Sequence, residues 1–249
     1  MIPNPIRKVL SSIRRHRVHA LLMGGQACVL YGAAEFSRDI DLAILADPQN
    51  LTRLQKALAD LKAEPIAVPP FDASYLQRGH AIHFRCTALG AERMRLDVMS
   101  KMRGLEPFPK LWSRRMALVL PGGISCDLMA LPDLVKAKKT QRDKDWPMIR
   151  RLVEAHYFQN RSHPTWAQTA FWMRELRTPE LLIEIARRYP RACRRFVPTR
   201  PLLAAALSGD TKGIAAKLFE EEKKEREKDR AYWLPLLREL EAMRHKRSK

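Results

Sequence analysis

The sequence reads Leu21-Leu22-Met23-Gly24-Gly25 and, after thirteen intervening residues, Asp39-Ile40-Asp41-Leu42-Ala43-Ile44. The second stretch alternates acidic and apolar side chains, which predicts a strand with Asp39 and Asp41 on one face and the isoleucines and leucine on the other. Two adjacent carboxylates provide the hard oxygen ligands that Mg²⁺ prefers, and Mg²⁺ often shares its remaining positions with phosphate oxygens and water. We therefore interpret this face as a candidate site for metal-dependent phosphoryl transfer.

Two glycines separate the first predicted strand from a predicted helix. Residues 18–23 are mainly apolar and predict a strand, whereas residues 26–32 predict a short helix. Glycine lets the backbone approach a phosphate closely, and a helix N-terminus attracts negative charge. Gly24 and Gly25 are therefore candidate phosphate-binding residues. The acidic pair alone is a weak indicator, because most such pairs are only solvated.

The combination of an apolar strand, Gly-Gly, a short helix and Asp-apolar-Asp-apolar resembles the signature of the nucleotidyltransferase superfamily, which has the DNA polymerase beta-like fold. That family uses a third carboxylate from a neighbouring strand. Asp97 is the candidate, because residues 93–99 alternate charged and apolar side chains as a half-buried strand does. The resemblance covers residues 18–155 and is strongest to minimal bacterial members, which include toxins of toxin–antitoxin and abortive-infection systems.

This resemblance implies an α+β fold with a nucleotidyltransferase domain at residues 1–157, in which helices flank a mixed sheet. It leaves the C-terminal part unexplained, and the helical pattern of residues 158–249 predicts a separate helical domain there. The resemblance also implies two Mg²⁺ ions and a nucleoside triphosphate substrate. Asp39, Asp41 and Asp97 would be both the metal ligands and the catalytic residues. The residues expected to bind the nucleotide are Gly24, Gly25, Ser37, Arg38, Lys138, Arg142 and Lys144.

One position departs from the family pattern. Many relatives carry Arg two residues before a Ser or Thr that precedes the acidic pair, but this chain has Glu35 there. Ser37 is present, so the missing positive charge would have to come from Arg38. The departure affects which side chain binds the triphosphate on that side of the site.

The downstream basic residues have a second interpretation. Lys138 and Arg142 lie one turn apart on a predicted helix, where they would either neutralise phosphate or pair with Asp133 and Asp145. Lys144 lies next to Asp145, and such a pair at the start of a helix also serves as a cap. The sequence leaves both interpretations open.

The chain has 249 residues, with 46 Lys and Arg against 27 Asp and Glu, giving a formal net charge of +19. Such an excess favours a polyanionic partner, most simply a nucleic acid, although a basic surface that only faces solvent is the alternative. The charge also counts against a cationic small molecule as the acceptor.

An arginine-rich segment in the second half surrounds Tyr189 and Phe196, and no acidic residue occurs from residue 185 to residue 209. Arginines bind phosphates while aromatic rings stack on bases, a combination common in proteins that bind single-stranded or tRNA-like ligands. The alternative is a helix junction whose arginine stems cover apolar surface. The residues expected to contact RNA are Arg187, Arg188, Arg191, Arg194 and Arg195, with Arg200 in the same cluster.

The remaining pattern sets the order of elements. A helix is predicted at residues 5–16, a helix capped by Asn50 follows, and strands are predicted at residues 81–86, 94–99, 116–120 and 124–129. Pro121-Gly122-Gly123 predicts a hairpin turn. Prolines divide residues 158–249 into four or five short helices. His80 and His83 are expected to be structural, and the tryptophans are expected to be packing residues: Trp112, Trp146, Trp166, Trp172 and Trp233.

The four cysteines form no Cys-x-x-Cys pair, which argues against a zinc site or a disulfide framework. No apolar run reaches the length of about 18 residues that a membrane helix needs, and no signal-peptide pattern is present. We therefore expect a cytoplasmic protein that makes no membrane contact.

The function expected from the sequence is Mg²⁺-dependent transfer of a nucleoside monophosphate to tRNA or another RNA, as a toxin or phage-defence effector with an antitoxin as a further partner. One alternative is nucleotidylation of a protein or small molecule. The other is a non-catalytic nucleic-acid-binding scaffold of the same fold.

Overall fold

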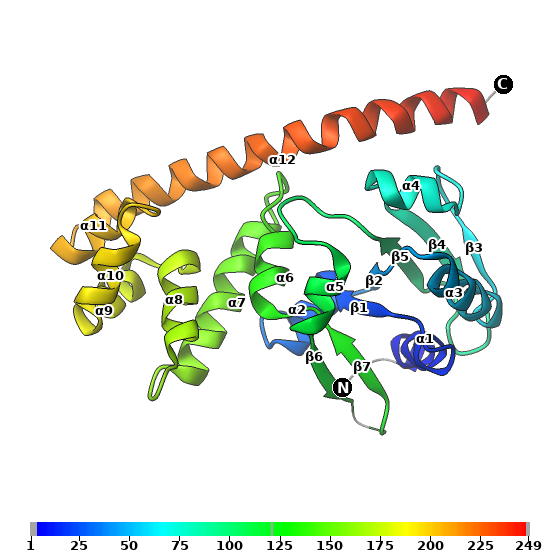
Figure 1. Ribbon diagram of the computed structural model, residues 1–249, viewed down its shortest axis with the longest axis horizontal. Coiled ribbons are helices and arrows are strands. Elements are labelled where there is room, and N and C mark those ends of the chain that lie inside the picture. Colours follow the sequence, from blue (N-terminus) through cyan, green and yellow to red (C-terminus); the bar gives the residue numbers. More distant parts are fainter. Residues whose placement is uncertain (1–3, 121, 248–249) are drawn as a thin grey trace. The chain divides into compact units, whose positions relative to one another are not determined.

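The computed structural model describes residues 4–120 and 122–247 (Figure 1). These residues form an α+β fold with one seven-stranded mixed sheet and a long C-terminal helix, which confirms the α+β part of the prediction. The chain divides into two compact units. The sheet unit contains the described residues of 1–30, 34–137 and 232–249, and the helical unit contains residues 31–33 and 138–231. The units thus separate at residues 137 and 138, whereas the sequence indicated a domain boundary at residues 157 and 158.

The strands follow the order β3-β4-β5-β2-β1-β7-β6 across the sheet. Strand β2 lies parallel to β5, and β1 lies parallel to β7, while the other neighbours are antiparallel. The strands are β1 (Ala20–Met23), β2 (Asp39–Ile44), β3 (Ala63–Pro65), β4 (Ile82–Cys86), β5 (Arg95–Met99), β6 (Met116–Val119) and β7 (Ser125–Leu128).

Strand β2 has the predicted alternation. Ile40, Leu42 and Ile44 are fully buried, and Asp39 and Asp41 are half-buried on the other face. Each buried apolar side chain contributes roughly 1.5–3 kcal/mol of transfer free energy, so the apolar face fixes the register of the strand. That register determines where both carboxylates point.

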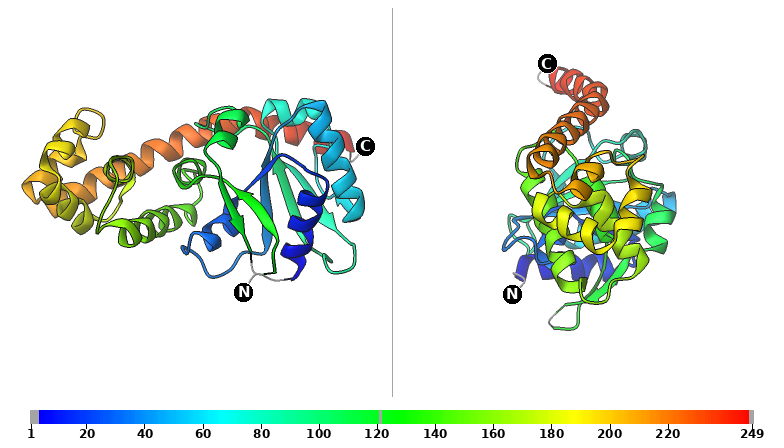
Figure 2. Two further views of the ribbon diagram at one scale, coloured as in Figure 1. Left: turned by 60° about the horizontal axis from the view of Figure 1, so that its bottom comes forward. Right: turned by 90° about the vertical axis from the view of Figure 1, so that its left-hand side faces the viewer.

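Helices cover the sheet, and Figure 2 shows α1 beside α3 against it. Helix α1 buries Ile6, Val9, Leu10 and Ile13 as predicted. The Ser12 hydroxyl on α1 donates to a carbonyl of α3 at 3.3 Å. The helices of this unit are α1 (Asn4–Arg15), α2 (Gly24–Leu30), α3 (Pro48–Asp60), α4 (Ala73–Arg78), α5 (Phe108–Ser113), α6 (Leu131–Ala137) and the last part of α12 (Thr211–Arg247).

The prediction that Asn50 caps α3 is wrong. Asp47 caps the helix by accepting from the Asn50 backbone N–H at 2.7 Å, and Pro48 takes the first helical position. The Asn50 side chain is buried and binds the backbone of His19 instead, accepting from its N–H at 2.7 Å and donating to its carbonyl at 3.0 Å. This amide holds the loop between α1 and β1 in place.

The predicted hairpin joins β6 and β7. The Leu120 N–H donates to the Ile124 carbonyl at 2.8 Å, and the Gly123 N–H donates to the Leu120 carbonyl at 3.0 Å. Pro121, which belonged to this prediction, lies outside the described residues. Within the described part of the chain no helix has the length and apolar character needed to cross a membrane.

The helical unit contains α7 (Asp145–Asn160), α8 (Trp166–Glu175), α9 (Pro179–Arg188), α10 (Pro190–Phe196), α11 (Leu202–Ser208) and the first part of α12. The prediction of short helices fails for the last of them, because α12 runs for 37 residues. Acidic and basic side chains four apart support it, as in the pair of Glu222 and Arg226 at 2.7 Å. Pro235 lies inside this helix without ending it.

Candidate active site

The register of the sheet brings the three predicted carboxylates onto one face. Asp41 on β2 is paired with Asp97 on the parallel strand β5, and Asp39 is paired with Arg95. Paired residues on neighbouring strands point to the same face, and such strands lie about 4.8 Å apart. His83 on β4 continues the row, because it is paired with Asp97 from the other side. One face of the sheet therefore carries a compact acidic group with two basic neighbours.

The diglycine lies directly against this group. Gly24 has a φ of +66°, and a Cβ atom at this position would overlap Oδ2 of Asp41. A Cβ atom on Gly25 would lie 2.6 Å from the Ser37 hydroxyl, and the Gly25 N–H donates to Oδ2 of Asp41 at 3.4 Å. Both glycines are thus needed for the close approach of α2 to β2. Their role in binding phosphate stays a prediction.

Arg95 and His83 are the site residues that sequence reasoning missed. Nε and Nη2 of Arg95 donate to the two oxygens of Asp97 at 2.8 and 2.9 Å, a bidentate pair. Nδ1 of His83 lies 2.9 Å from Oδ1 of Asp97. His83 is therefore part of the site, contrary to the purely structural role expected for it. His80 does have that structural role, because it is buried and pairs with Glu239 at 2.7 Å.

These contacts shift the pKa values of the pair. Burial raises the pKa of Asp97, but the hydrogen bonds from His83 and Arg95 outweigh it and hold that pKa below its ordinary value. The hydrogen bond to Asp97 raises the pKa of Arg95, and the charges of Asp39 and Asp41 act in the same direction. Arg95 thus serves as the counter-ion of all three carboxylates.

The donor chemistry of this face fits Mg²⁺, since the three carboxylates supply oxygen ligands from adjacent positions. In the described residues, however, no group of three or more His, Cys, Asp or Glu side chains is arranged to hold a metal ion. Both oxygens of Asp97 are bound by Arg95 and His83. Asp39 and Asp41 would be the first ligands of a cation, and Asp97 would join them only after Arg95 moves away.

We expect Arg95→Ala to lower the free energy of unfolding by about 1 kcal/mol at pH 7, a value reduced because Arg95 is partly exposed. A carboxyl whose pKa is depressed by folding contributes stability above its unfolded pKa, about 3.9, and loses it as the pH falls through the folded pKa. The difference in free energy of unfolding between the wild type and Arg95→Ala should therefore decrease below about pH 4. Denaturant unfolding from pH 3 to pH 8 measures it.

The control for this experiment is Arg85→Ala. Arg85 lies beside Arg95 in the β4–β5 register and is exposed. Its removal deletes the same charge from the same sheet without touching Asp97. An equal pH dependence of both variants would contradict the assignment of Arg95 as the counter-ion.

Ser37 and Arg38 lie at the edge of the carboxylate face. The Ser37 hydroxyl donates to the Asp39 carbonyl at 3.2 Å, so it fixes the start of β2. Arg38 is exposed, and its guanidinium lies 5.9 Å from the ring centre of Phe36. Phe36 itself is 62% exposed. An exposed arginine and an exposed aromatic ring thus stand next to the acidic pair.

The downstream basic residues belong to the helical unit, and two of them pair with a carboxylate. Asp145 is buried and accepts from Lys138 at 3.1 Å, from the Thr140 hydroxyl at 2.5 Å and from Arg142 at 2.7 Å. Burial raises the pKa of Asp145, but the charges of Lys138 and Arg142 and these hydrogen bonds outweigh it, so the pKa lies below its ordinary value. Local pairing, one of the two interpretations, is thus what the structure contains. Lys144 is exposed and its side chain does not cap α7.

The five arginines predicted to contact RNA are all exposed, but Arg200 is not part of their surface. Arg200 is buried and donates hydrogen bonds to Glu221 and to the carbonyls of Met173 and Leu176. These contacts join three segments of the helical unit. Arg188 donates to two carbonyls after α7, at 2.6 and 3.2 Å. The surface is therefore best represented by Arg187, Arg191, Arg194 and Arg195.

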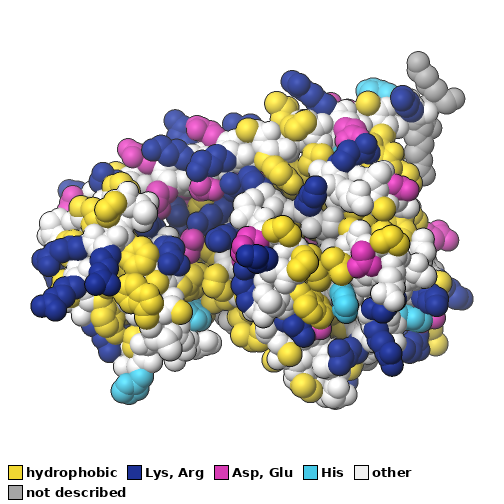
Figure 3. All heavy atoms as spheres, viewed as in Figure 1, with side chains coloured by type: hydrophobic (Ala, Val, Ile, Leu, Met, Phe, Trp, Pro, Cys, Tyr) yellow, Lys and Arg dark blue, Asp and Glu magenta, His cyan; other side chains and the backbone are white. Residues whose placement is uncertain are grey.

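One exposed and one half-buried aromatic ring lie near these arginines. Trp166 is 57% exposed, so it is not the packing residue that the sequence predicted. Its ring lies 6.1 Å from that of Phe196, over which the Arg174 guanidinium lies at 5.2 Å. Figure 3 shows Lys and Arg side chains around exposed apolar side chains on this unit. Aromatic and guanidinium groups side by side suit an unpaired nucleic acid strand.

No protein-family model matches the chain, and no curated protein is significantly similar to it in sequence. The nucleotidyltransferase resemblance therefore rests on the residues from Leu21 to Ile44 and on Asp97. The structure itself contains a shared face of the three carboxylates, a diglycine packed against Asp41 and an ion pair of Arg95 with Asp97.

Proposed function

We propose that the protein is a Mg²⁺-dependent nucleotidyltransferase that moves a nucleoside monophosphate from a nucleoside triphosphate to an RNA. The observation that supports it best is the placement of Asp39, Asp41 and Asp97 on one face of a mixed sheet, beside a diglycine turn. Bound Mg²⁺ would neutralise the triphosphate and activate the attacking hydroxyl. Attack on the α-phosphorus would break its bond to the β-phosphate and release pyrophosphate.

The residues of the chain would divide this task. Asp39 and Asp41 are the cation ligands, because they lie two residues apart on one face of β2, beside the diglycine turn. The lowered pKa of Asp97 favours its ionised form, which would serve as a cation ligand and would orient the attacking hydroxyl or accept its proton. If a cation took the place of Arg95 at Asp97, the Arg95 guanidinium would be available to bind the phosphates of the substrate in the bidentate geometry that it favours.

An RNA acceptor is supported by the charge and by the helical unit. The net charge of +19 attracts polyanions, and the exposed arginines lie near the exposed Trp166 ring and the half-buried Phe196 ring. A small-molecule acceptor would not require an extended basic and aromatic surface of this kind. A role as a toxin or phage-defence effector, and an antitoxin partner, belong to the same proposal and rest on the family resemblance.

The test is incubation of the protein with each labelled nucleoside triphosphate, Mg²⁺ and total cellular RNA or lysate. We expect labelled RNA, and we expect no label in EDTA. Label in a protein or small molecule would favour the second kind of acceptor. Absence of all transfer, with RNA binding retained, would favour a non-catalytic scaffold.

Neutralising Arg187, Arg191, Arg194 and Arg195 to Gln should weaken RNA binding and flatten its salt dependence. Each phosphate that the protein no longer neutralises lowers the slope of log K against log salt by roughly 0.7 for a single strand. Removal of four such charges should therefore lower the slope by roughly 3. Filter binding or fluorescence anisotropy over a series of salt concentrations measures it.

The matched control removes four charges elsewhere in the helical unit. Exposed lysines on α12 serve this purpose, and the substitutions are to Gln at Lys212, Lys217, Lys223 and Lys224. The control should reduce the slope much less than the arginine variant. Equal slopes for the two variants would show that the arginine surface has no special role.

A further inference from the structure

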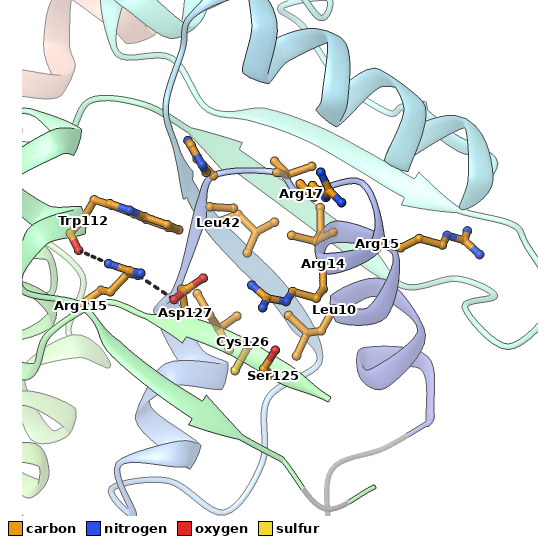
Figure 4. Close-up of a pocket in the computed structure, with 15 residues that line it drawn as sticks. Leu10, Arg14, Arg15, Arg17, Leu42, Trp112, Arg115, Ser125, Cys126 and Asp127 are labelled. Carbon is orange, nitrogen blue, oxygen red and sulfur yellow. Dashed lines mark hydrogen bonds and ion pairs between the residues drawn. The ribbon is translucent and has the colours of Figure 1, made fainter. Parts of the chain in front are cut away.

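A cavity of about 360 Å³ lies in the sheet unit, beside α1 and the first residues of β1 and β7 (Figure 4). Leu42 lines it, and Leu42 follows Asp41 directly in a strand, so the two side chains point to opposite faces. Helix α1 forms one wall and Trp112 of α5 forms another. The cavity has the size of a small-molecule site, roughly 300–1,000 Å³, and is too small for a folded macromolecule.

Two arginines at this cavity have no ion-pair partner in the described part of the chain. Four arginines line it, but Arg15 pairs with Asp60 and points away in Figure 4, and Arg115 pairs with Asp127 at 2.7 Å. Arg14 and Arg17 are exposed, and among the described residues their guanidinium groups make no ion pair or hydrogen bond. The rim of the cavity therefore carries about two uncompensated positive charges.

The backbone at Arg17 fixes the position of this residue at the end of α1. Its φ is +53°, the left-handed conformation that normally favours glycine, at the position just after α1. A side chain in this conformation costs of order 1 kcal/mol, and the turn is held as a helix C-cap by the Val18 N–H, which donates to the Ile13 carbonyl at 3.1 Å. The Asn50 amide fixes the same loop through the backbone of His19. The arginine is thus held at the rim by a strained but well-supported turn.

The opposite wall of the cavity is aromatic. The rings of His19 and Trp112 lie 5.0 Å apart, and the Arg115 guanidinium lies 4.0 Å from the centre of the Trp112 ring. The floor is apolar, and Leu22 and Leu42 contribute to it. The Asp127 carboxylate is a hydrogen-bond acceptor beside this wall. This wall fits a planar ligand that packs against the rings and donates an N–H group to Asp127.

From these features we propose that the cavity binds a nucleoside 5′-monophosphate. A phosphate monoester carries a charge of about −1.5 to −2 at pH 7, which matches Arg14 and Arg17 better than the single charge of a carboxylate or a phosphodiester. The base occupies the side walled by His19 and Trp112. The monophosphate is either a free nucleotide or the 5′ end of an RNA. This site is separate from the carboxylate face and does not depend on the proposed transfer activity.

The test is isothermal titration calorimetry with AMP, GMP, CMP and UMP in EDTA. We expect Arg14→Ala and Arg17→Gly each to weaken binding at least roughly tenfold, the usual effect of losing a charged hydrogen bond. Arg17→Gly relieves the strained conformation, so its thermal midpoint should stay equal or rise while binding falls. Arg85→Ala removes the same charge at a position that does not line the cavity and should bind like the wild type. Asp41→Asn should also bind normally.

Two further ligands identify what is recognised. Inorganic phosphate and the unphosphorylated nucleoside should each bind at least roughly tenfold more weakly than the nucleotide, because each contacts only one side of the cavity. A short RNA with a 5′-phosphate that binds more tightly than the free nucleotide, while its 5′-hydroxyl form does not, would support the proposal and identify an RNA end as the source. Equal affinity for inorganic phosphate, or no nucleotide binding at all, would overturn it.

Discussion

Asp41→Asn should reduce nucleotide transfer by roughly 10³-fold or more while the protein stays folded. Asp41 is the central carboxylate of the site, because Asp97 lies beside it on β5 and Gly24 lies against it on the other side. Loss of a cation ligand removes several kcal/mol of transition-state stabilisation, and about 4 kcal/mol corresponds to 10³-fold in rate. The substitution keeps the shape of the side chain. It also removes one charge from an acidic group, so the thermal midpoint should be unchanged or slightly higher.

Glu64→Gln is the control for this prediction. Glu64 is an exposed carboxylate on β3, at the edge of the same sheet. Its neutralisation changes the net charge of the protein by the same amount and should leave transfer unchanged. Labelled-nucleotide transfer and a thermal melt of each variant decide the matter. Full transfer by Asp41→Asn would mean that this face is not the catalytic site.

The elements near the carboxylates could be predicted because their local patterns are strong. The alternation in residues 39–44 and in residues 93–99 has the period of a half-buried strand, and burial of the apolar face then fixes the register. Failures occurred where a local signal had two meanings. Asn50 precedes an apolar helical pattern as a cap does, but Asp47 also precedes it, and the tertiary contact with His19 takes Asn50 into the interior.

The helical unit shows a different limit of sequence patterns. Short helices were expected throughout this region, yet α12 runs for 37 residues and includes Pro235. Aromatic residues were expected to pack inside, yet Trp166 is mostly exposed. The length of α12 and the exposure of Trp166 both depend on the tertiary contacts that these residues make. Propensity alone does not contain that information.

The partners of the site were harder to predict than its carboxylates. Arg95 lies two residues before Asp97, so its position on the same face follows from the alternation. Its bidentate contact, however, depends on side-chain rotamers. His83 reaches Asp97 only through the pairing of β4 with β5. Strand pairing is a long-range property, and the spacing of residues along the chain does not determine it.

The second large effect is expected for Gly24→Ala. Alanine in the left-handed conformation costs roughly 1–2 kcal/mol, and its Cβ atom would overlap the Asp41 carboxylate. Either the helix α2 or Asp41 must then move, which adds a cost of similar size. The expected loss of about 2–4 kcal/mol should lower the thermal midpoint by roughly 5–15 °C. Transfer should fall about as far as in Asp41→Asn, because the carboxylate is displaced.

Gly90→Ala separates the two causes of that effect. Gly90 has a φ of +81° in the same sheet unit, but a Cβ atom there would meet no heavy atom within 4 Å. This variant therefore carries the conformational cost alone and should lose about 1–2 kcal/mol with full transfer activity. The difference between the two glycine variants measures the contact with Asp41. If both variants showed the same decrease in stability and both kept their activity, the close packing of Gly24 on Asp41 would not be what positions the catalytic carboxylate.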